Sequence, residues 1–204
     1  SEAEKEAELR ITPGSSLHYA SAADFKKIPG APIAYWVSSQ VREVYATARN
    51  LKDISHVCVG LQTGENDRFV RMWYEVEHSH IGFGFGSTVK ARESALTWFP
   101  YNKGGEYRKW YGNQSFVVNW KDDGADIRNF VGPSGRIRSR PQNTDQYFQP
   151  ALSWSKVTSG RFALRCFPKG FIFDVAGCSI FIQREDHRNL VLGMLNSRIM
   201  SATI

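Results

Sequence analysis

Residues 98–120 read WFPYNKGGEYRKWYGNQSFVVNW. Eight of these residues are aromatic, and Lys103, Arg108 and Lys109 lie between them together with the pair Gly104-Gly105. A folded domain needs buried aromatic side chains, but its core does not require cations and glycines among them. Aromatic faces, cations and amides are the groups that hold a nucleic-acid backbone and read its bases. The stretch therefore indicates a nucleic-acid surface attached to a core segment.

The aromatic residues of this stretch are expected to divide between core and surface. Large aromatic side chains contribute strongly to burial. Tyr107 and Tyr111 flank the pair Arg108-Lys109, and we expect these two tyrosines near solvent and near a ligand. We expect most of the following four to be core: Trp98, Phe99, Phe116 and Trp120.

Outside this stretch, apolar periodicity and turn residues predict short strands, with helices near both ends of the chain. The first helix is expected to begin at about Ser38, and Asp186 is expected to cap the last one. The expected strands are 56–59, 69–76, 116–120, 161–166, 171–175 and 178–182. The sequence predicts an α+β fold, a single domain of short, mostly antiparallel strands in a twisted sheet or partial barrel. Residues 1–52 form the expected helical lead-in, and residues 53–204 form the expected recognition domain.

The positive charge of the chain is concentrated in its middle third. The 204 residues carry a net charge of +6. Residues 101–170 hold 12 Lys and Arg against 5 Asp and Glu, whereas residues 1–100 hold 11 against 12. Evenly spread lysines would favour solubility alone, but a concentration of this kind indicates an anionic partner. A solvated basic face without a partner is the alternative.

The cations and amides of the chain supply the candidate DNA contacts. Arg136, Arg138 and Arg140 alternate within residues 132–141, so an extended backbone would aim all three to one side. Arginine pairs with guanine, and amide side chains such as Gln142 pair with adenine. The predicted set is Asn66, Lys103, Tyr107, Arg108, Lys109, Tyr111, Arg136, Arg138, Arg140, Gln142, Asn143, Lys156, Arg161 and Lys169.

Within this set we expect a division of roles. The four lysines would mainly position the phosphate backbone. The base-reading candidates are Arg108, Arg136, Arg138, Arg140, Gln142 and Asn143. Tyr107 and Tyr111 would wedge or stack where a base leaves the duplex. Ordinary surface charge is the alternative for each cation, and a turn or capping role is the alternative for the amides.

No catalytic, cofactor-binding or metal-binding residue is predicted in this chain. Residues 83–86 read FGFG, but they lack the spacing of a GxGxxG loop and a following Lys-Ser/Thr. Asp122 and Asp123, before a glycine, are typical of a turn between strands. A metal-dependent nuclease that uses these carboxylates or Asp174 remains an alternative. A protein- or carbohydrate-binding module whose tryptophans stack on sugars is the other.

Cysteine spacing and hydropathy indicate a cytoplasmic protein without a membrane partner. Cys58, Cys166 and Cys178 have no paired short spacing, so reduced thiols are the simplest interpretation. No apolar run approaches the ~18 residues of a membrane span, and the first ten residues lack the apolar core of a signal peptide.

Six blocks of the sequence carry a family resemblance: GLQTGENDRF at 60–69, WFPYNKGGEYRKWYGN at 98–113, RSRPQNT at 138–144, WSKVTSGRF at 154–162, PKGFIFDVAG at 168–177 and LGMLNS at 192–197. Together they resemble the target-recognition region of BREX-type adenine-specific DNA methyltransferases, the PglX family. They are more distantly similar to specificity domains of Type IIG and Type I restriction–modification enzymes. The block at 98–113 is the most specific of the six.

The resemblance implies a whole protein that transfers a methyl group from S-adenosylmethionine to adenine N6 within a defined site. Such enzymes carry a cofactor loop and an Asn-Pro-Pro-Tyr/Phe motif, but this sequence contains no Asn-Pro dipeptide. We therefore expect a non-catalytic part that recognises double-stranded DNA, with no cofactor of its own and the catalytic domain outside this chain. Other defence-system proteins and a DNA-mimic inhibitor are further expected partners.

Overall fold

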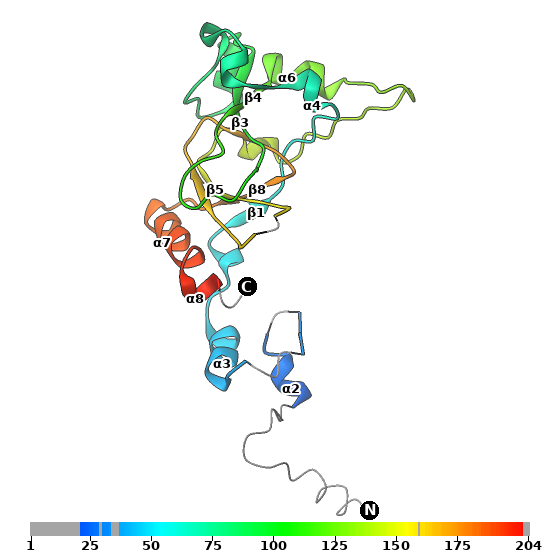
Figure 1. Ribbon diagram of the computed structural model, residues 1–204. Helices are drawn as coiled ribbons and strands as arrows, with labels where there is room; N and C mark the ends of the chain where they lie inside the picture. The colour runs from blue at the N-terminus through cyan, green and yellow to red at the C-terminus, as the bar shows by residue number, and fades with distance from the viewer. Residues whose placement is uncertain (1–20, 29, 34–36, 159, 202–204) are drawn as a thin grey trace, which may run out of the picture. The chain divides into compact units, whose positions relative to one another are not determined.

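The computed structural model describes residues 21–28, 30–33, 37–158 and 160–201 (Figure 1). The chain divides into two compact units, Ser1–Asn50 and Leu51–Ile204, and each is described by itself. Residues 1–20, on which part of the expected helical lead-in falls, lie outside the described residues.

The first unit contains the short helix α2 (Ala22–Phe25) and the helix α3 (Ser39–Thr47). Ser38 has an extended backbone, with φ −64° and ψ 156°, and its hydroxyl accepts the N–H of Val41 at 3.3 Å. This bond satisfies one of the N–H groups that a helix start leaves unpaired. The helix start predicted at Ser38 is therefore confirmed.

The second unit contains two four-stranded sheets of short strands (Figure 1). The strands are β1 (His56–Cys58), β2 (Val70–Met72), β3 (Trp98–Asn102), β4 (Phe116–Asn119), β5 (Ala151–Ser155), β6 (Arg165–Phe167), β7 (Ile172–Phe173) and β8 (Gly177–Phe181). One sheet has the order β1-β8-β5-β6 with antiparallel neighbours. The other has the order β2-β4-β3-β7, in which β3 and β7 run parallel. The described strands form open sheets, and the predicted α+β fold of mostly antiparallel strands is confirmed.

Short helices connect and flank these strands. They are η1 (Leu51–Asp53), α4 (Asn66–Phe69), η2 (Trp73–Glu75), η3 (His78–His80), α5 (Thr88–Glu93), α6 (Lys121–Arg128), η4 (Thr144–Gln146), α7 (Glu185–Leu195) and α8 (Arg198–Ser201). The longest, α7, packs Val191 into a small apolar cluster with Leu152, Leu164 and Ile180. The helix near the C-terminal end of the chain therefore closes one end of this core.

The larger core cluster is built on β3 and β4. Phe99, Tyr101 and Trp120 are each at most 1% exposed. The Trp120 ring meets the Tyr147 ring edge-on, with centroids 5.2 Å apart. Burying one such side chain removes ~150–250 Å² from water, which stabilises the fold by about 4–6 kcal/mol as an upper estimate. Phe116 is half-buried and packs against this cluster, whereas Trp98 is half-buried outside it. The prediction that most of these four aromatic residues belong to the core is therefore confirmed.

The strand expected over 69–76 is shorter in the structure. Only Val70–Met72 pairs as a strand, and its register with β4 ends where Met72 meets Phe116. The chain then turns, because the Glu75 carboxylate accepts the N–H of Met72 at 2.6 Å. The prediction of a longer strand is therefore wrong.

The Asp122-Asp123-Gly124 segment forms the expected tight turn but does not join two strands. Its φ angles are 52°, 58° and 73°, all left-handed, and a short helical turn follows within α6. A side chain at Gly124 would place its Cβ 2.5 Å from the Trp120 ring. The close approach to this buried indole therefore favours glycine.

The helix α7 starts differently from the prediction. Arg184, not Asp186, occupies the N-cap position, and the Arg184 Nε donates to Asp186 Oδ1 at 3.1 Å. The expected apolar stripe is only partly buried, because Leu190 and Met194 are 59% and 53% exposed. The predicted Asp186 cap is therefore wrong.

Candidate nucleic-acid interface

Two isolated backbone bridges extend the second sheet to the arginine-containing segment. Leu61 forms a parallel bridge with Asp174, directly after β7, and Gln62 forms an antiparallel bridge with Arg140. The Gln62 N–H donates to the Arg140 carbonyl at 3.1 Å, and the Arg140 N–H donates to the Gln62 carbonyl at 2.8 Å. We call residues 62–64 and 138–140 together the two-chain ribbon. It attaches the predicted arginines to the folded core.

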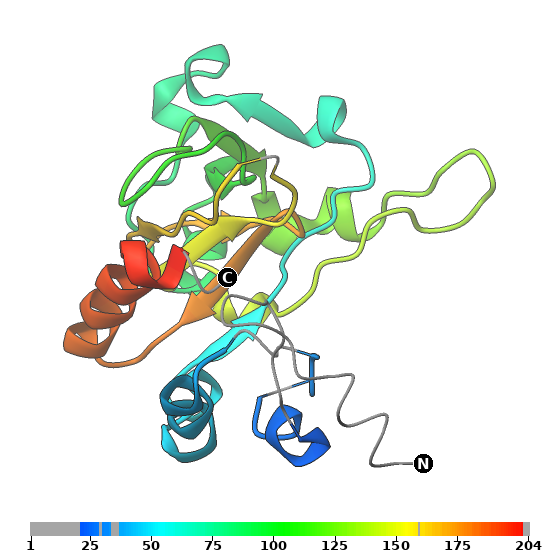
Figure 2. The same cartoon turned by 60° about the horizontal axis from the view of Figure 1, so that its bottom comes forward.

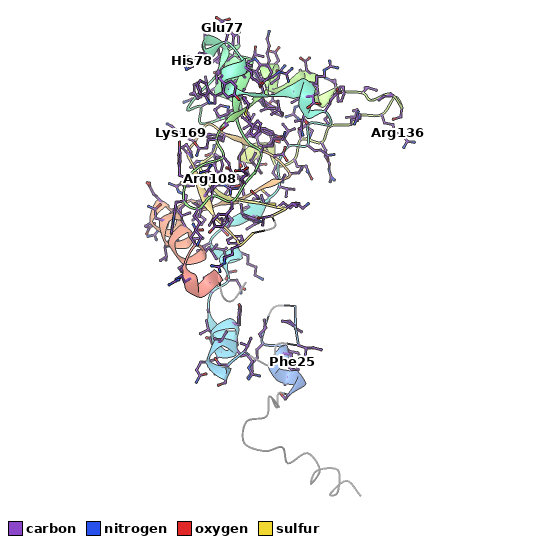
Figure 3. All side chains as sticks on the ribbon, viewed as in Figure 1. Phe25, Glu77, His78, Arg108, Arg136 and Lys169 are labelled. Carbon is purple, nitrogen blue, oxygen red and sulfur yellow. The ribbon has the colours of Figure 1, made fainter. Side chains whose placement is uncertain are left out.

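The arginines of this segment fall into two places. Ser139 is 9% exposed and donates its hydroxyl to the Ile127 carbonyl, whereas Arg138 and Arg140 on either side are exposed. Alternation therefore turns these two arginines to the same side, as predicted. Arg136 lies instead in a hairpin loop, residues 131–137, which projects from the unit in both Figure 1 and Figure 2. Figure 3 places Arg136 at the outer part of this loop.

Arg68, which lies outside the predicted set, joins this group. Its guanidinium carbon lies 5.1 Å from the ring centroid of Phe130, and that of Arg138 lies 6.0 Å from the same centroid. Both cations are therefore positioned by one aromatic ring. Arg68 was missed because it stands alone beside Asp67, in the part of the chain where acids outnumber bases.

The predicted amide readers occupy structural positions. Asn66 is exposed at the start of α4, and its side-chain oxygen accepts the Thr63 hydroxyl at 2.8 Å. Gln142 and Asn143 donate their amides to the backbone carbonyls of residues 60 and 59, at 3.2 Å and 2.8 Å. Base reading by Gln142 or Asn143 stays a prediction. It would require these backbone bonds to be exchanged for bonds to a base.

Residues 103–115, which we call the aromatic loop, are attached to β5 by a buried arginine. Arg165 is 1% exposed and donates to Ser155 Oγ at 3.1 Å and to the Arg108 carbonyl at 3.4 Å. Ser155 in turn donates to the Gly105 carbonyl at 2.7 Å. Burial lowers the pKa of the Arg165 guanidinium. The backbone of the loop is thus held at two carbonyls.

The tip of the aromatic loop is open to solvent. Tyr107, Trp110 and Tyr111 are 50%, 49% and 69% exposed, so the expected exposure of the two tyrosines is confirmed. Trp110 has a left-handed backbone, with φ 70°, and pairs with Arg165 through a parallel bridge. Tyr107 and Arg161 line one shallow hollow, together with Trp154, Thr158 and Phe162. The structure therefore brings two predicted contacts together at this hollow.

The predicted lysines are dispersed over the unit. The Lys103 ammonium lies 5.1 Å from the Phe116 ring centroid, and Lys156 is exposed after β5. Lys109 is half-buried and donates to the Asn196 carbonyl at 2.7 Å, so its ammonium is already engaged by the protein. Lys169 is exposed, and Figure 3 shows it and Arg136 on opposite sides of the unit.

The predicted cations share one electrostatic property. Within the described residues, none of the nine has a carboxylate within 4.0 Å, whereas pairs such as Arg128–Asp123 and Arg184–Asp186 form elsewhere. An exposed cation without a carboxylate partner keeps its full charge for a ligand. The nine are Lys103, Arg108, Lys109, Arg136, Arg138, Arg140, Lys156, Arg161 and Lys169.

Two of the three carboxylates considered for a metal-dependent nuclease, Asp174 and Asp123, have structural partners. Asp174 is 6% exposed and accepts the Tyr101 hydroxyl at 2.5 Å and the Ala176 N–H at 2.6 Å. Burial raises the pKa of Asp174, although the Tyr101 bond lowers it. Asp123 pairs with Arg128 at 3.1 Å. In the described part of the chain, no three His, Cys, Asp or Glu side chains are grouped as a metal site.

A separate hollow of about 860 Å³ lies near η1 and the start of α7. Its walls include Lys52, His56, Asp145, Arg184 and His187, and none of the predicted DNA contacts lines it. Among the helices that the structure describes, none is long and apolar enough to span a membrane.

Comparison with known proteins gives two relatives, and no protein-family model matches the chain. The chain is 45% identical over 184 residues to an adenine-specific methyltransferase PglX of Lacticaseibacillus casei (strain Zhang). It is 35% identical over 182 residues to an adenine-specific methyltransferase BrxX of Escherichia coli O9:H4 (strain HS).

These matches cover most of the chain but little of either relative. They include 88% and 87% of this chain, and the chain spans only 15% and 14% of the length of the two relatives. The activity for which the relatives are named is that of much longer proteins. At 45% and 35% identity over most of its length, the chain belongs to the family of PglX and BrxX adenine-specific methyltransferases.

Proposed function

We propose that this chain is a duplex-DNA recognition module of an adenine-specific methyltransferase. The observation that carries the proposal is the set of nine predicted cations, none of which has a carboxylate partner within the described residues. Duplex DNA carries one negative charge per ~1.7 Å, and cations that neutralise its phosphates release bound counterions. A surface whose guanidiniums and ammoniums are not neutralised by carboxylates is therefore suited to this polyanion.

Two regions of the surface contribute different contacts. The two-chain ribbon and the projecting hairpin carry exposed arginines, and arginine is suited to both phosphates and guanine edges. The aromatic loop carries Tyr107, Trp110 and Tyr111, whose rings stack on bases or on an unpaired nucleotide. Lys156 and Arg161 are exposed cations that position the DNA backbone near this loop, and the exposed Arg108 within the loop is a candidate for base reading.

The methyl transfer itself belongs to the whole protein in this proposal. The relatives are named adenine-specific methyltransferases, and this chain corresponds to a small part of each. S-adenosylmethionine and the reactive site would then lie in a catalytic domain outside this chain, which is its direct partner. This chain would select the DNA site at which that catalytic domain acts.

Duplex binding and its salt dependence test the proposal. We expect the chain to bind a fluorescein-labelled, mixed-sequence DNA duplex, with anisotropy that reports weaker binding as salt rises. Replacing Arg136, Arg138 and Arg140 together by Ala should weaken duplex binding. It should also reduce the slope of log affinity against log salt by ~0.9 for each of these arginines that contacts a phosphate. A control that replaces Lys90, Arg92 and Lys121 by Ala removes the same charge from exposed positions outside the predicted set.

The outcomes separate the proposal from its alternatives. No duplex binding by the wild-type chain refutes the function. An arginine variant whose affinity and salt slope both equal those of the wild type refutes the placement of the site. Magnesium-dependent cleavage that disappears when Asp122, Asp123 or Asp174 is replaced would indicate a nuclease instead. Binding to oligosaccharides that does not respond to salt would indicate a carbohydrate-binding module.

A further inference from the structure

The bridge between Gln62 and Arg140 places an amide and a guanidinium side by side. The two residues exchange both backbone hydrogen bonds, at 3.1 Å and 2.8 Å. In a hydrogen-bonded antiparallel pair, the Cα atoms lie about 5.5 Å apart and the side chains project to the same face. Gln62 and Arg140 therefore leave the ribbon as neighbours.

Both side chains face solvent and have no other task in the described structure. Leu61 and Thr63, on either side of Gln62, are 0% and 3% exposed, and Ser139 beside Arg140 is 9% exposed. Gln62 and Arg140 are exposed by contrast, and neither side chain has a hydrogen bond or ion pair within the described residues. The alternation therefore turns Gln62 and Arg140 toward solvent, while their neighbours in the chain are buried.

The ribbon that carries this pair is narrow. Gly64 lies across from Arg138, and a Cβ on Gly64 would lie 2.9 Å from the Arg138 carbonyl carbon. Its φ of +81° also favours glycine. Because no side chain of residue 64 separates the two chains, they remain close beyond the bridge. The major groove of B-DNA is wide enough to admit a two-stranded ribbon.

We propose that Gln62 and Arg140 read two neighbouring base pairs in the major groove. Gln62 pairs with N6 and N7 of adenine, and Arg140 pairs with O6 and N7 of guanine. The inference rests on the proposed DNA-recognition function and adds its specificity residues. In this inference adenine is recognised by the amide of Gln62, which has no hydrogen-bond partner within the described residues. The amides of Gln142 and Asn143, by contrast, donate to backbone carbonyls.

Selection from a randomised duplex pool tests this assignment. The 204-residue chain is incubated with the pool, bound duplexes are recovered and sequenced, and the enriched motif is compared between wild type and variants. We expect the wild type to enrich a motif with adjacent adenine and guanine. Gln62→Ala should lose the preference at the adenine position alone, and Arg140→Ala should lose it at the guanine position alone. Each should bind the wild-type motif about five- to a hundredfold more weakly.

A third variant gives a change of preference in place of a loss. Glu accepts a hydrogen bond from N4 of cytosine, so Gln62→Glu should shift the preferred base at that position from adenine to cytosine. Gln183→Ala and Arg92→Ala are matched controls, because both residues are exposed and lie outside the ribbon. They should leave the motif unchanged. Thermal unfolding of every variant checks that the fold is retained.

The possible results distinguish this inference from the function on which it rests. A wild-type chain that does not bind the pool overturns the proposed function, and the inference with it. A chain that binds the pool without enriching a sequence overturns the inference alone. So does a motif that stays unchanged in Gln62→Ala and Arg140→Ala.

Discussion

Replacing Gly60 by Ala is expected to destabilise the second unit at the point where the ribbon joins the sheet. A Cβ at this position would lie 1.9 Å from the Phe173 carbonyl oxygen and 2.7 Å from the carbonyl carbon. These are backbone atoms of β7, so rotation of a side chain does not relieve the contact. The distance must lengthen from 1.9 Å to at least 3.0 Å, which forces the two chains apart.

The cost of this separation has two parts. Leu61, the next residue, is 0% exposed and donates its N–H to the same Phe173 carbonyl at 2.7 Å. A buried N–H that loses its acceptor costs about 1–3 kcal/mol. Overpacking by one methyl group costs about 1–3 kcal/mol more. We therefore expect the free energy of unfolding to fall by about 2–6 kcal/mol, a large share of a typical domain stability of ~5–15 kcal/mol.

Urea unfolding followed by tryptophan fluorescence measures this difference. Gly193→Ala is the matched control, because it adds the same methyl group at an exposed position within α7 where nothing lies within 4 Å. Alanine is a better helix former than glycine, so this control should gain about 0.5–1 kcal/mol. If the free energy of unfolding of Gly60→Ala lies within about 0.5 kcal/mol of the wild-type value, the close approach of Gly60 to the Phe173 carbonyl is wrong.

Three further predictions concern polar groups that the fold removes wholly or partly from solvent. Asn196 is 3% exposed, and its side chain makes two hydrogen bonds to the Leu164 backbone at 2.9 Å and 2.8 Å. Asn196→Ala should therefore lower the free energy of unfolding by about 2–4 kcal/mol. An unchanged urea midpoint would contradict this prediction. Burial, and then the charge of Asp174, raises the pKa of Tyr101 well above its ordinary value of 10.0. The folded state therefore holds this proton more tightly, and the resulting stability is present below pH ~10 and is lost as the pH rises above it. Unfolding at increasing pH should show a smaller alkaline loss for Tyr101→Phe than for the wild type, and parallel curves would exclude this cause. Burial raises the pKa of Cys58 to about 11, so its native thiol should react with iodoacetamide about a hundredfold more slowly than after unfolding, as followed by mass spectrometry. Equal iodoacetamide reaction rates for Cys58 in the native and unfolded states would contradict a thiol pKa raised by burial.

The parts of the fold that depend on local sequence were predictable. Ser38 caps a helix because its hydroxyl reaches an N–H only three residues away. The length of β2 was not predictable, because it is set by pairing with β4, whose first residue, Phe116, lies far along the chain. The predicted start of α7 was wrong for a local reason. Asp186 has a side chain suited to an N-cap, but it pairs with Arg184 instead. Propensity alone does not decide between such competing partners.

The sequence predicted many of the residue types of the candidate site, but not the contacts that these side chains make with distant parts of the chain. The concentration of cations in residues 101–170 led to the arginines of the ribbon and the hairpin. The predicted set also includes Gln142 and Lys109, whose side chains donate to backbone carbonyls 82 and 87 residues away in sequence. Arg68 and Gln62 are outside the predicted set, because neither stands in a basic run. Long-range pairing brings these two beside the arginines.

The anchoring of the surface bears on specificity as well as stability. Phe99 and Trp120 are fully buried at the two ends of the 98–120 stretch, while Tyr107 and Tyr111 between them are exposed. Because β3 and β4 pair antiparallel, their connecting loop leaves the sheet at one end of this strand pair. Arg165 and Ser155 then hold the carbonyls of Arg108 and Gly105 in this loop. A side chain that must be ordered on binding costs about 0.5–1.5 kcal/mol, and a loop held before binding reduces that cost. The same core that makes the stretch fold therefore presents its exposed rings in a defined position, which a basic surface of mobile side chains would not achieve.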